Sequence, residues 1–233
     1  MALDIYVGSL TRYYAQDWET AGARVAREMG ASYEVVRLPP KPAEDAVTDP
    51  AVVQEAVVGW RMSLEAGLRQ HLTEGLSWDD EAKAPYFTDR PSWEGYAGVL
   101  LLAAHAECPD VPRPESAASE WDADAAYQRV TSRGFSSRFP QIYDVQLWLP
   151  CRFSFKFKAP DVAGAEVWIG SSVALLDQLA LLNGETFRVG GGGPFEDNDG
   201  ASAFDKSARF GLEMFLRLAR FSVEHRLPMK LDY

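Results

Sequence analysis

Apolar residues alternate with polar residues near both ends of the chain, and this two-residue period predicts β-strands in both places. Strands so far apart in the sequence indicate a central mixed sheet to which both ends of the chain contribute. The strands that we expect are Leu3–Val7, Tyr33–Leu38, Gln141–Leu149, Arg152–Lys158, Ala165–Ile169 and Glu185–Val189.

Between and after these strands, apolar residues recur every three or four positions, which is the period of an amphipathic helix. Asp17 and Asp49 are suited to cap two of the helices, and Asp199 or Ser202 is suited to cap the last one. The expected helices are Asp17–Met29, Pro50–Leu68, Ser92–Ala106, Glu115–Thr131, Ser172–Leu182 and Phe204–Val223. We therefore expect one α+β domain over residues 1–233, with residues 49–131 as a helical, acidic subdomain.

The net charge of −11 is concentrated in the middle of the chain. Residues 41–124 contain 17 acidic and 6 basic side chains. Nucleic acids and anionic membranes are bound by concentrated Lys and Arg, so this charge distribution argues against both as partners. Two interpretations remain, namely a solvated surface that keeps the protein soluble and a surface that binds a basic protein partner.

No apolar run approaches the roughly 20 residues needed to cross a bilayer, and Asp4 stands where a signal peptide would carry a basic residue. We therefore expect a cytoplasmic protein. Cys108 and Cys151 are too few for a disulfide framework and belong to no CxxC pair, so reduced packing residues are expected.

Four consecutive glycines, Gly190 to Gly193, precede a cluster of Glu, Asp and Asn residues. The pattern lacks the Lys-Ser or Lys-Thr of a P-loop and the last glycine of GxGxxG, and it places Lys206 where an EF-hand needs glutamate. We interpret the segment as a structural or mobile loop, with a lid over a partner or ligand and a metal site as alternatives. No cofactor and no metal are expected.

The candidate partner-binding residues are two tryptophans, each surrounded by carboxylates. A tryptophan among acidic residues can offer an apolar anchor within a charged rim. The two clusters consist of Trp78 with Asp79, Asp80 and Glu81, and of Trp121 with Glu120, Asp122 and Asp124. The alternative is that both tryptophans are buried and the acids merely solvate them.

A second group of polar and aromatic residues follows the first expected strand, where α/β sheets often present ligand-binding loops. Such a group could bind an anion, stack a ring or supply an acid and a base, although core packing and helix capping would use the same residues. Its members are Tyr6, Arg12, Tyr14, Asp17 and Trp18.

The chain contains no GxSxG, HExxH or kinase signature. The leading hypothesis is therefore a non-enzymatic protein-binding protein that engages a basic partner, as an inhibitor, an immunity-like protein or an adaptor would. The alternative hypothesis is an enzyme or small-ligand binder with its pocket at the end of the first strand. The two hypotheses differ in whether the residues after that strand converge in a cleft or serve the fold.

Overall fold

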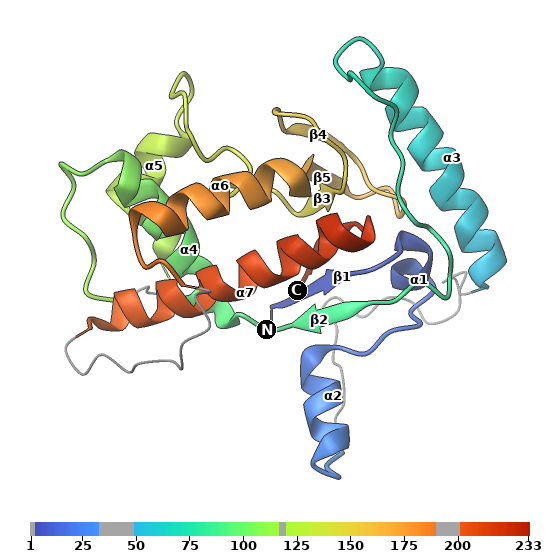
Figure 1. Ribbon diagram of the computed structural model, residues 1–233, viewed down its shortest axis with the longest axis horizontal. Helices are drawn as coiled ribbons and strands as arrows, with labels where there is room; N and C mark the ends of the chain where they lie inside the picture. Colours follow the sequence, from blue (N-terminus) through green and yellow to red (C-terminus); the bar gives the residue numbers. More distant parts are fainter. Residues whose placement is uncertain (1–2, 33–48, 117–119, 190–200) are drawn as a thin grey trace.

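A mixed sheet lies at the centre of the fold, and its strands come from both ends of the chain (Figure 1). The computed structural model describes residues 3–32, 49–116, 120–189 and 201–233. Within these residues, six strands pair in the order β2-β1-β6-β3-β5-β4. The strands are β1 (Asp4–Val7), β2 (Phe87–Asp89), β3 (Leu147–Leu149), β4 (Phe157–Pro160), β5 (Glu166–Ser171) and β6 (Met229–Asp232). The expected α+β class is confirmed.

The first and last strands along the chain, β1 and β6, are neighbours in the sheet. β1 pairs antiparallel with β6, and Asp4 lies opposite Asp232. β6 also pairs antiparallel with β3, which in turn runs parallel to β5. β2 and β4 complete the two edges, each antiparallel to its neighbour. The sheet therefore depends on contacts between residues at opposite ends of the sequence.

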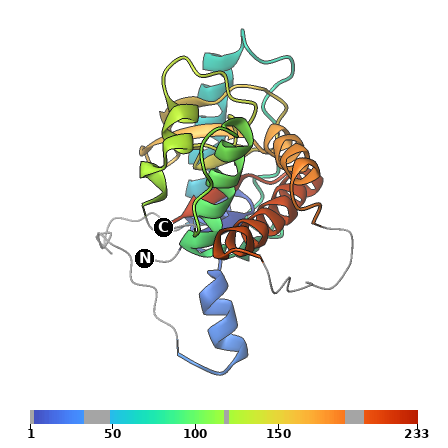
Figure 2. The same cartoon turned by 90° about the vertical axis from the view of Figure 1, so that its left-hand side faces the viewer.

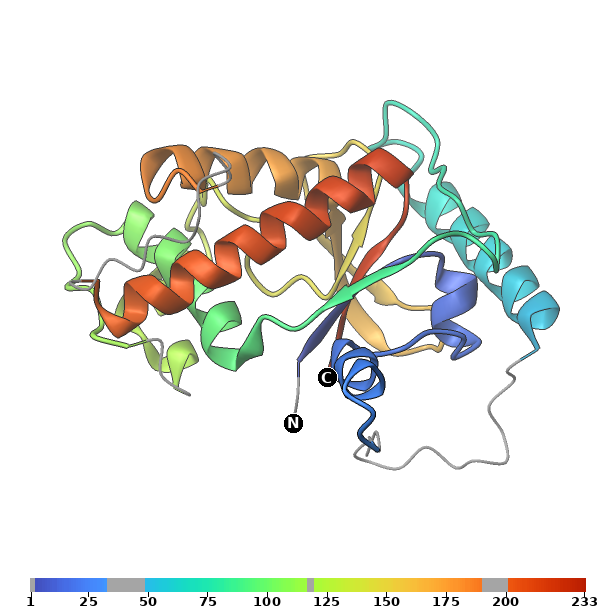
Figure 3. The same cartoon turned by 60° about the horizontal axis from the view of Figure 1, so that its bottom comes forward.

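Helices cover both faces of the sheet (Figures 1 and 3). α4, α6 and α7 pack with the larger apolar cluster on one face, and α1 and α3 pack with the smaller cluster on the other. α2 extends away from this body (Figure 2). The helices are α1 (Leu10–Tyr14), α2 (Ala21–Glu28), α3 (Pro50–Leu68), α4 (Ser92–Glu107), η1 (Trp121–Ala123, a 3-10 turn), α5 (Ala125–Thr131), α6 (Ser172–Glu185) and α7 (Ala203–His225). Of these described helices, none has the length and apolar composition that a membrane span requires.

α4 and α7 cross at a very short distance because glycines lie at their contact. A Cβ atom added to Gly211 of α7 would collide with the carbonyl oxygen of Gly95 of α4. A Cβ added to Gly98 would lie 2.7 Å from the backbone of Ala208. The crossing therefore requires hydrogen in place of a side chain at these positions.

Several helix starts agree with the sequence prediction. Asp49 caps α3 by accepting a hydrogen bond from the backbone N–H of Ala51 at 2.9 Å, and Pro50 begins that helix. Ser202 caps α7 by accepting a hydrogen bond from the N–H of Asp205 at 3.0 Å.

The expected helix at residues 17–29 is wrong in its start, and Asp17 is not a cap. Residues 10–14 form α1, Gln16 adopts a left-handed conformation with φ 63°, and α2 begins only after Thr20. Thr20 is its N-cap, because its hydroxyl accepts a hydrogen bond from the N–H of Ala23 at 3.1 Å. The carboxylate of Asp17 instead pairs with Arg12 at 3.5 Å.

Other expected elements are shorter than the sequence pattern suggested. Residues 141–146 do not form a strand, since Asp144 is left-handed with φ 63°, and only residues 147–149 join the sheet. Residues 186–189 follow α6 without forming a strand. Residues 120–131 contain η1 and α5 rather than one continuous helix, and β2 lies inside the expected helical region 49–131. The expected strand at 33–38 and the Gly190–Gly193 loop lie outside the described residues.

The glycine crossing gives a stability prediction. We expect Gly211→Ala to lower the free energy of unfolding by about 1–3 kcal/mol, as overpacking of a close contact typically does. As a control, Gly59→Ala on α3, where nothing lies within 4 Å of the added methyl group, should be neutral or stabilising by up to about 1 kcal/mol. Urea denaturation measures both variants. Equal stability of Gly211→Ala and the wild type would show that the helices do not cross at this distance.

Candidate functional site

A pocket of about 330 Å³ opens at the end of the sheet where β1 begins and β6 ends. Its wall consists of aromatic side chains from α4, η1, α5, β5 and the residue that follows β6. Leu3 and Leu231 add an apolar surface from the sheet, and Asp144 and Gln146 add polar groups. The six aromatic residues, which we call the aromatic wall, are Trp93, Tyr96, Trp121, Tyr127, Trp168 and Tyr233.

Five of these rings contact one another edge to face in a continuous series. Tyr233 and Trp93 have ring centroids 5.8 Å apart, and Trp93 and Tyr96 are 6.0 Å apart. Tyr96 and Trp121 follow at 5.9 Å, and Trp121 and Tyr127 at 5.0 Å, with interplanar angles of 89° and 87°. Edge-to-face pairs stabilise each other by about 0.5–1.5 kcal/mol beyond the burial of their area. The rings therefore support one another and form corners rather than a flat surface.

Asp144 supplies the carboxylate of the pocket. One of its oxygens, Oδ1, accepts a hydrogen bond from the Tyr127 hydroxyl at 2.9 Å, and the other, Oδ2, lies 3.1 Å from Nζ of Lys156. Its left-handed backbone, with φ 63°, is uncommon outside glycine and is frequent at functional sites. Nearby, Oε1 of Gln146 accepts a hydrogen bond from the backbone N–H of Trp168 at 2.7 Å.

Tyr96 brings a hydroxyl group that has no hydrogen-bond partner among the described residues. The side chain is buried, with 8% exposed, and buried tyrosines usually find a partner for this group. Burial, followed by the proximity of Tyr233 and Asp144, raises the pKa of Tyr96 well above its ordinary value. The hydroxyl thus stays protonated at neutral pH and can donate a hydrogen bond.

Two lysine ammonium groups lie over the ring of Trp168, which lines the pocket. Nζ of Lys156 lies 5.0 Å from the ring centroid, and Nζ of Lys158 lies 5.4 Å from it. These are cation–π distances, because the negative face of an aromatic ring attracts a cation within about 6 Å. Trp168 therefore already binds cations of the chain itself.

The structure places the Trp121 cluster at this pocket. Trp121 is half-buried and belongs to the aromatic wall, and Glu120 and Asp122 are exposed beside it. Asp124 serves the fold, because its Oδ1 caps α5 through the N–H groups of residues 126 and 127 and its Oδ2 lies 3.3 Å from Nε2 of His105. Three of the four predicted residues thus lie where a partner could reach them.

The Trp78 cluster is different, because Trp78 is buried with 6% exposed. Its indole N–H donates to Oδ1 of Asp80 at 2.6 Å, and Oδ2 of Asp80 pairs with Arg61 at 2.9 Å. Oδ1 of Asp79 accepts a hydrogen bond from the N–H of Glu81. These contacts hold the loop against α3, so in this cluster only Glu81 is fully exposed.

The candidate residues at the end of β1 and in α1 lie close together, but their polar groups already make contacts within the fold. The Tyr6 hydroxyl donates to the carbonyl of Ser9, and the Tyr14 hydroxyl donates to Asp161 at 2.8 Å. Nη1 of Arg12 donates to the carbonyl of Ala84 at 2.9 Å. Trp18 packs against Tyr6, with 4.9 Å between ring centroids. This arrangement resembles a core more than a cleft.

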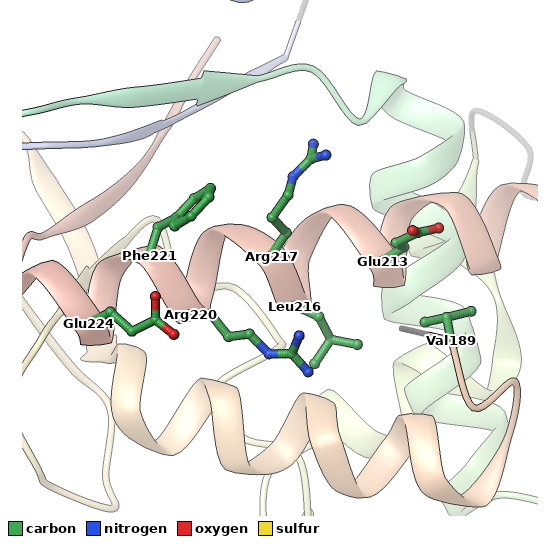
Figure 4. Close-up of a pocket in the computed structure, with 7 residues that line it drawn as sticks. All are labelled: Val189, Glu213, Leu216, Arg217, Arg220, Phe221 and Glu224. Atoms are coloured by element: carbon green, nitrogen blue, oxygen red, sulfur yellow. The ribbon is translucent and has the colours of Figure 1, made fainter. Parts of the chain in front are cut away.

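A second hollow of about 320 Å³ lies along α7 (Figure 4). Figure 4 shows Arg217 and Arg220 extending to opposite sides of the helix. Arg217 pairs with Asp89, and Phe221 stacks on Phe87 with ring centroids 4.3 Å apart. Glu213 and Glu224 of the same helix also line the hollow, so it has no dominant charge.

Reasoning from the sequence missed most of the aromatic wall. Only Trp121 was singled out, since the other members stand far apart along the chain and follow no motif. The one available signal was the abundance of tryptophan, with seven in 233 residues, of which three line the pocket.

No protein-family model matches this sequence, and neither the curated proteins nor the solved structures contain a match. Within the described ranges, no group of three or more His, Cys, Asp or Glu side chains is placed to hold a metal ion.

The buried Asp80 gives a pH prediction. Burial outweighs the Trp78 hydrogen bond and the Arg61 charge and raises the pKa of Asp80 to about 6. The native protein therefore binds a proton at pH values where the unfolded chain has lost it, and stability should fall as the pH rises from about 4 to about 6. We expect Asp80→Asn to flatten this part of the stability profile, measured by urea denaturation at several pH values.

The control is Glu81→Gln, which removes an exposed carboxylate next to Asp80 that does not contribute to its raised pKa and should keep the slope of the wild type. If Asp80→Asn keeps that slope as well, Asp80 does not titrate in this range.

Proposed function

We propose that this protein is a non-enzymatic binding protein, that it engages a basic protein partner, and that a positively charged group of the partner enters the aromatic pocket. The observation that carries the proposal is the series of edge-to-face rings around a pocket that also contains the carboxylate of Asp144. Aromatic faces and a carboxylate attract the same kind of ligand, namely a cation.

The size and position of the pocket support this proposal. A volume of about 330 Å³ is at the lower end of the range of small-molecule sites, which suits one side chain or head group. Tyr233 is 61% exposed at its edge, and the exposed Glu120 and Asp122 stand beside Trp121. A partner could therefore contact the surrounding surface while one of its groups occupies the pocket, as an anchor does in a protein interface.

The charge of the chain supports a basic partner over an acidic one. The net charge is −11, and the 17 acidic side chains of residues 41–124 include Glu120 and Asp122 beside the pocket. Charges of this kind act mainly on the rate of encounter, because they attract the partner before contact. The pocket would then determine the dissociation rate of the complex.

This division of roles gives a kinetic prediction, with an octalysine peptide as the basic probe. We expect the double variant Glu120→Gln, Asp122→Asn to associate several-fold more slowly than the wild type at low salt. The difference should vanish near 1 M salt, where the Debye length is about 3 Å. Stopped-flow tryptophan fluorescence measures the association rate.

The matched control is Glu55→Gln with Glu74→Gln, which removes the same charge from exposed positions on α3 and the loop after it. Equal slowing of both double variants would mean that net charge alone attracts the peptide. The surface beside Trp121 would then have no particular role, and the proposal would fail.

A further inference from the structure

We infer that the cation accepted by the aromatic pocket is a quaternary ammonium group, such as a trimethylated amine, rather than a primary ammonium or a guanidinium. The inference rests on the proposed binding of a cation in this pocket. It adds the chemical class of the group, which the hydrogen-bonding capacity of the lining residues determines.

A primary ammonium carries three N–H donors and a guanidinium carries five, and each loses its hydration on entering a pocket. The charged acceptor of the pocket, Asp144, already accepts a hydrogen bond from Tyr127 and pairs with Lys156. Oε1 of Gln146 already accepts one from Trp168. A ligand with several N–H donors would therefore compete for these acceptors with groups of the chain that already use them, and any donor left without a partner is unfavourable when buried.

A quaternary ammonium has no N–H group to satisfy. Its methyl groups need apolar contacts, which Leu3, Leu231 and the aromatic wall provide. Its charge needs the negative faces of aromatic rings, and recognition of quaternary ammonium ligands by aromatic residues uses this attraction. The near-perpendicular rings of Tyr96, Trp121 and Tyr127 form corners in which one rounded cation can touch several rings at once.

The Tyr96 hydroxyl suggests a second point of contact. The Tyr96 side chain is buried and lines the pocket, and its hydroxyl has no hydrogen-bond partner within the described part of the chain. A ligand with a polar oxygen a few bonds from the ammonium group could accept a hydrogen bond from this hydroxyl. Choline and phosphocholine contain such an oxygen, whereas the nearest oxygen of a trimethylated lysine belongs to the backbone at the other end of the side chain. The quaternary ammonium group itself could come from a free molecule, a lipid or a protein.

The test is a titration of the protein with tetramethylammonium and choline, monitored by tryptophan fluorescence. The comparison ligands are methylammonium, guanidinium and 3,3-dimethyl-1-butanol, which has the shape of choline without its charge. We expect the quaternary ligands to bind at least about tenfold more tightly than all three. Trp121→Ala should abolish binding, Trp121→Phe should retain part of it, and Trp60→Ala on α3 should have no effect.

The outcomes separate this inference from the proposed function. If methylammonium or guanidinium binds as tightly as tetramethylammonium, the pocket accepts cations but does not select the quaternary class, and only the inference fails. If the uncharged alcohol binds as tightly as choline, or if no cation binds, cation recognition itself fails and both proposals fall.

A further set of ligands identifies the source of the group. A peptide with trimethyl-lysine should bind more tightly than free choline and than the unmodified peptide, because a protein partner is proposed. Sedimentation of the protein with phosphatidylcholine vesicles, without binding of the peptide, would keep the quaternary inference and overturn the protein partner.

Discussion

The antiparallel pairing of β1 with β6 is the contact on which the rest of the structure depends. It places Asp4 opposite Asp232 and so joins the two ends of the chain within one sheet. Leu3, just before β1, and Leu231, within β6, become neighbouring parts of the pocket as a result. Neither end of the chain could form this surface alone, so the pocket exists only when the sheet is complete.

The close crossing of α4 and α7 also positions part of the pocket. Gly95 and Gly211 let the two helix backbones approach, and the same part of α4 carries Trp93 and Tyr96. The position of these rings relative to the sheet is therefore fixed by backbone contact rather than by flexible side chains. A wall positioned in this way loses little conformational entropy when a ligand binds, which favours affinity from a small number of contacts.

Periodic patterns predicted the long helices but not every strand, because the alternation at residues 152–158 forms a strand only from Phe157 onward. α3 and α7 follow from their caps and apolar spacing, whereas β2 and β6 are too short for a pattern and exist through their pairing with β1. Trp78 and Trp121 have nearly the same acidic neighbours, yet Trp78 is buried beside Arg61 and Trp121 lines the pocket. Local sequence could not separate them, because tertiary packing determines burial.

An NMR titration of the indole N–H signals with tetramethylammonium tests whether the aromatic wall is the binding site. The chain has seven tryptophans, and only Trp93, Trp121 and Trp168 line the pocket. Binding at the aromatic wall should shift these three signals and leave those of Trp78 and Trp148, both buried elsewhere, unchanged. Shifts spread over all seven signals, or confined to tryptophans outside the pocket, would contradict the claim that the aromatic wall is the binding site.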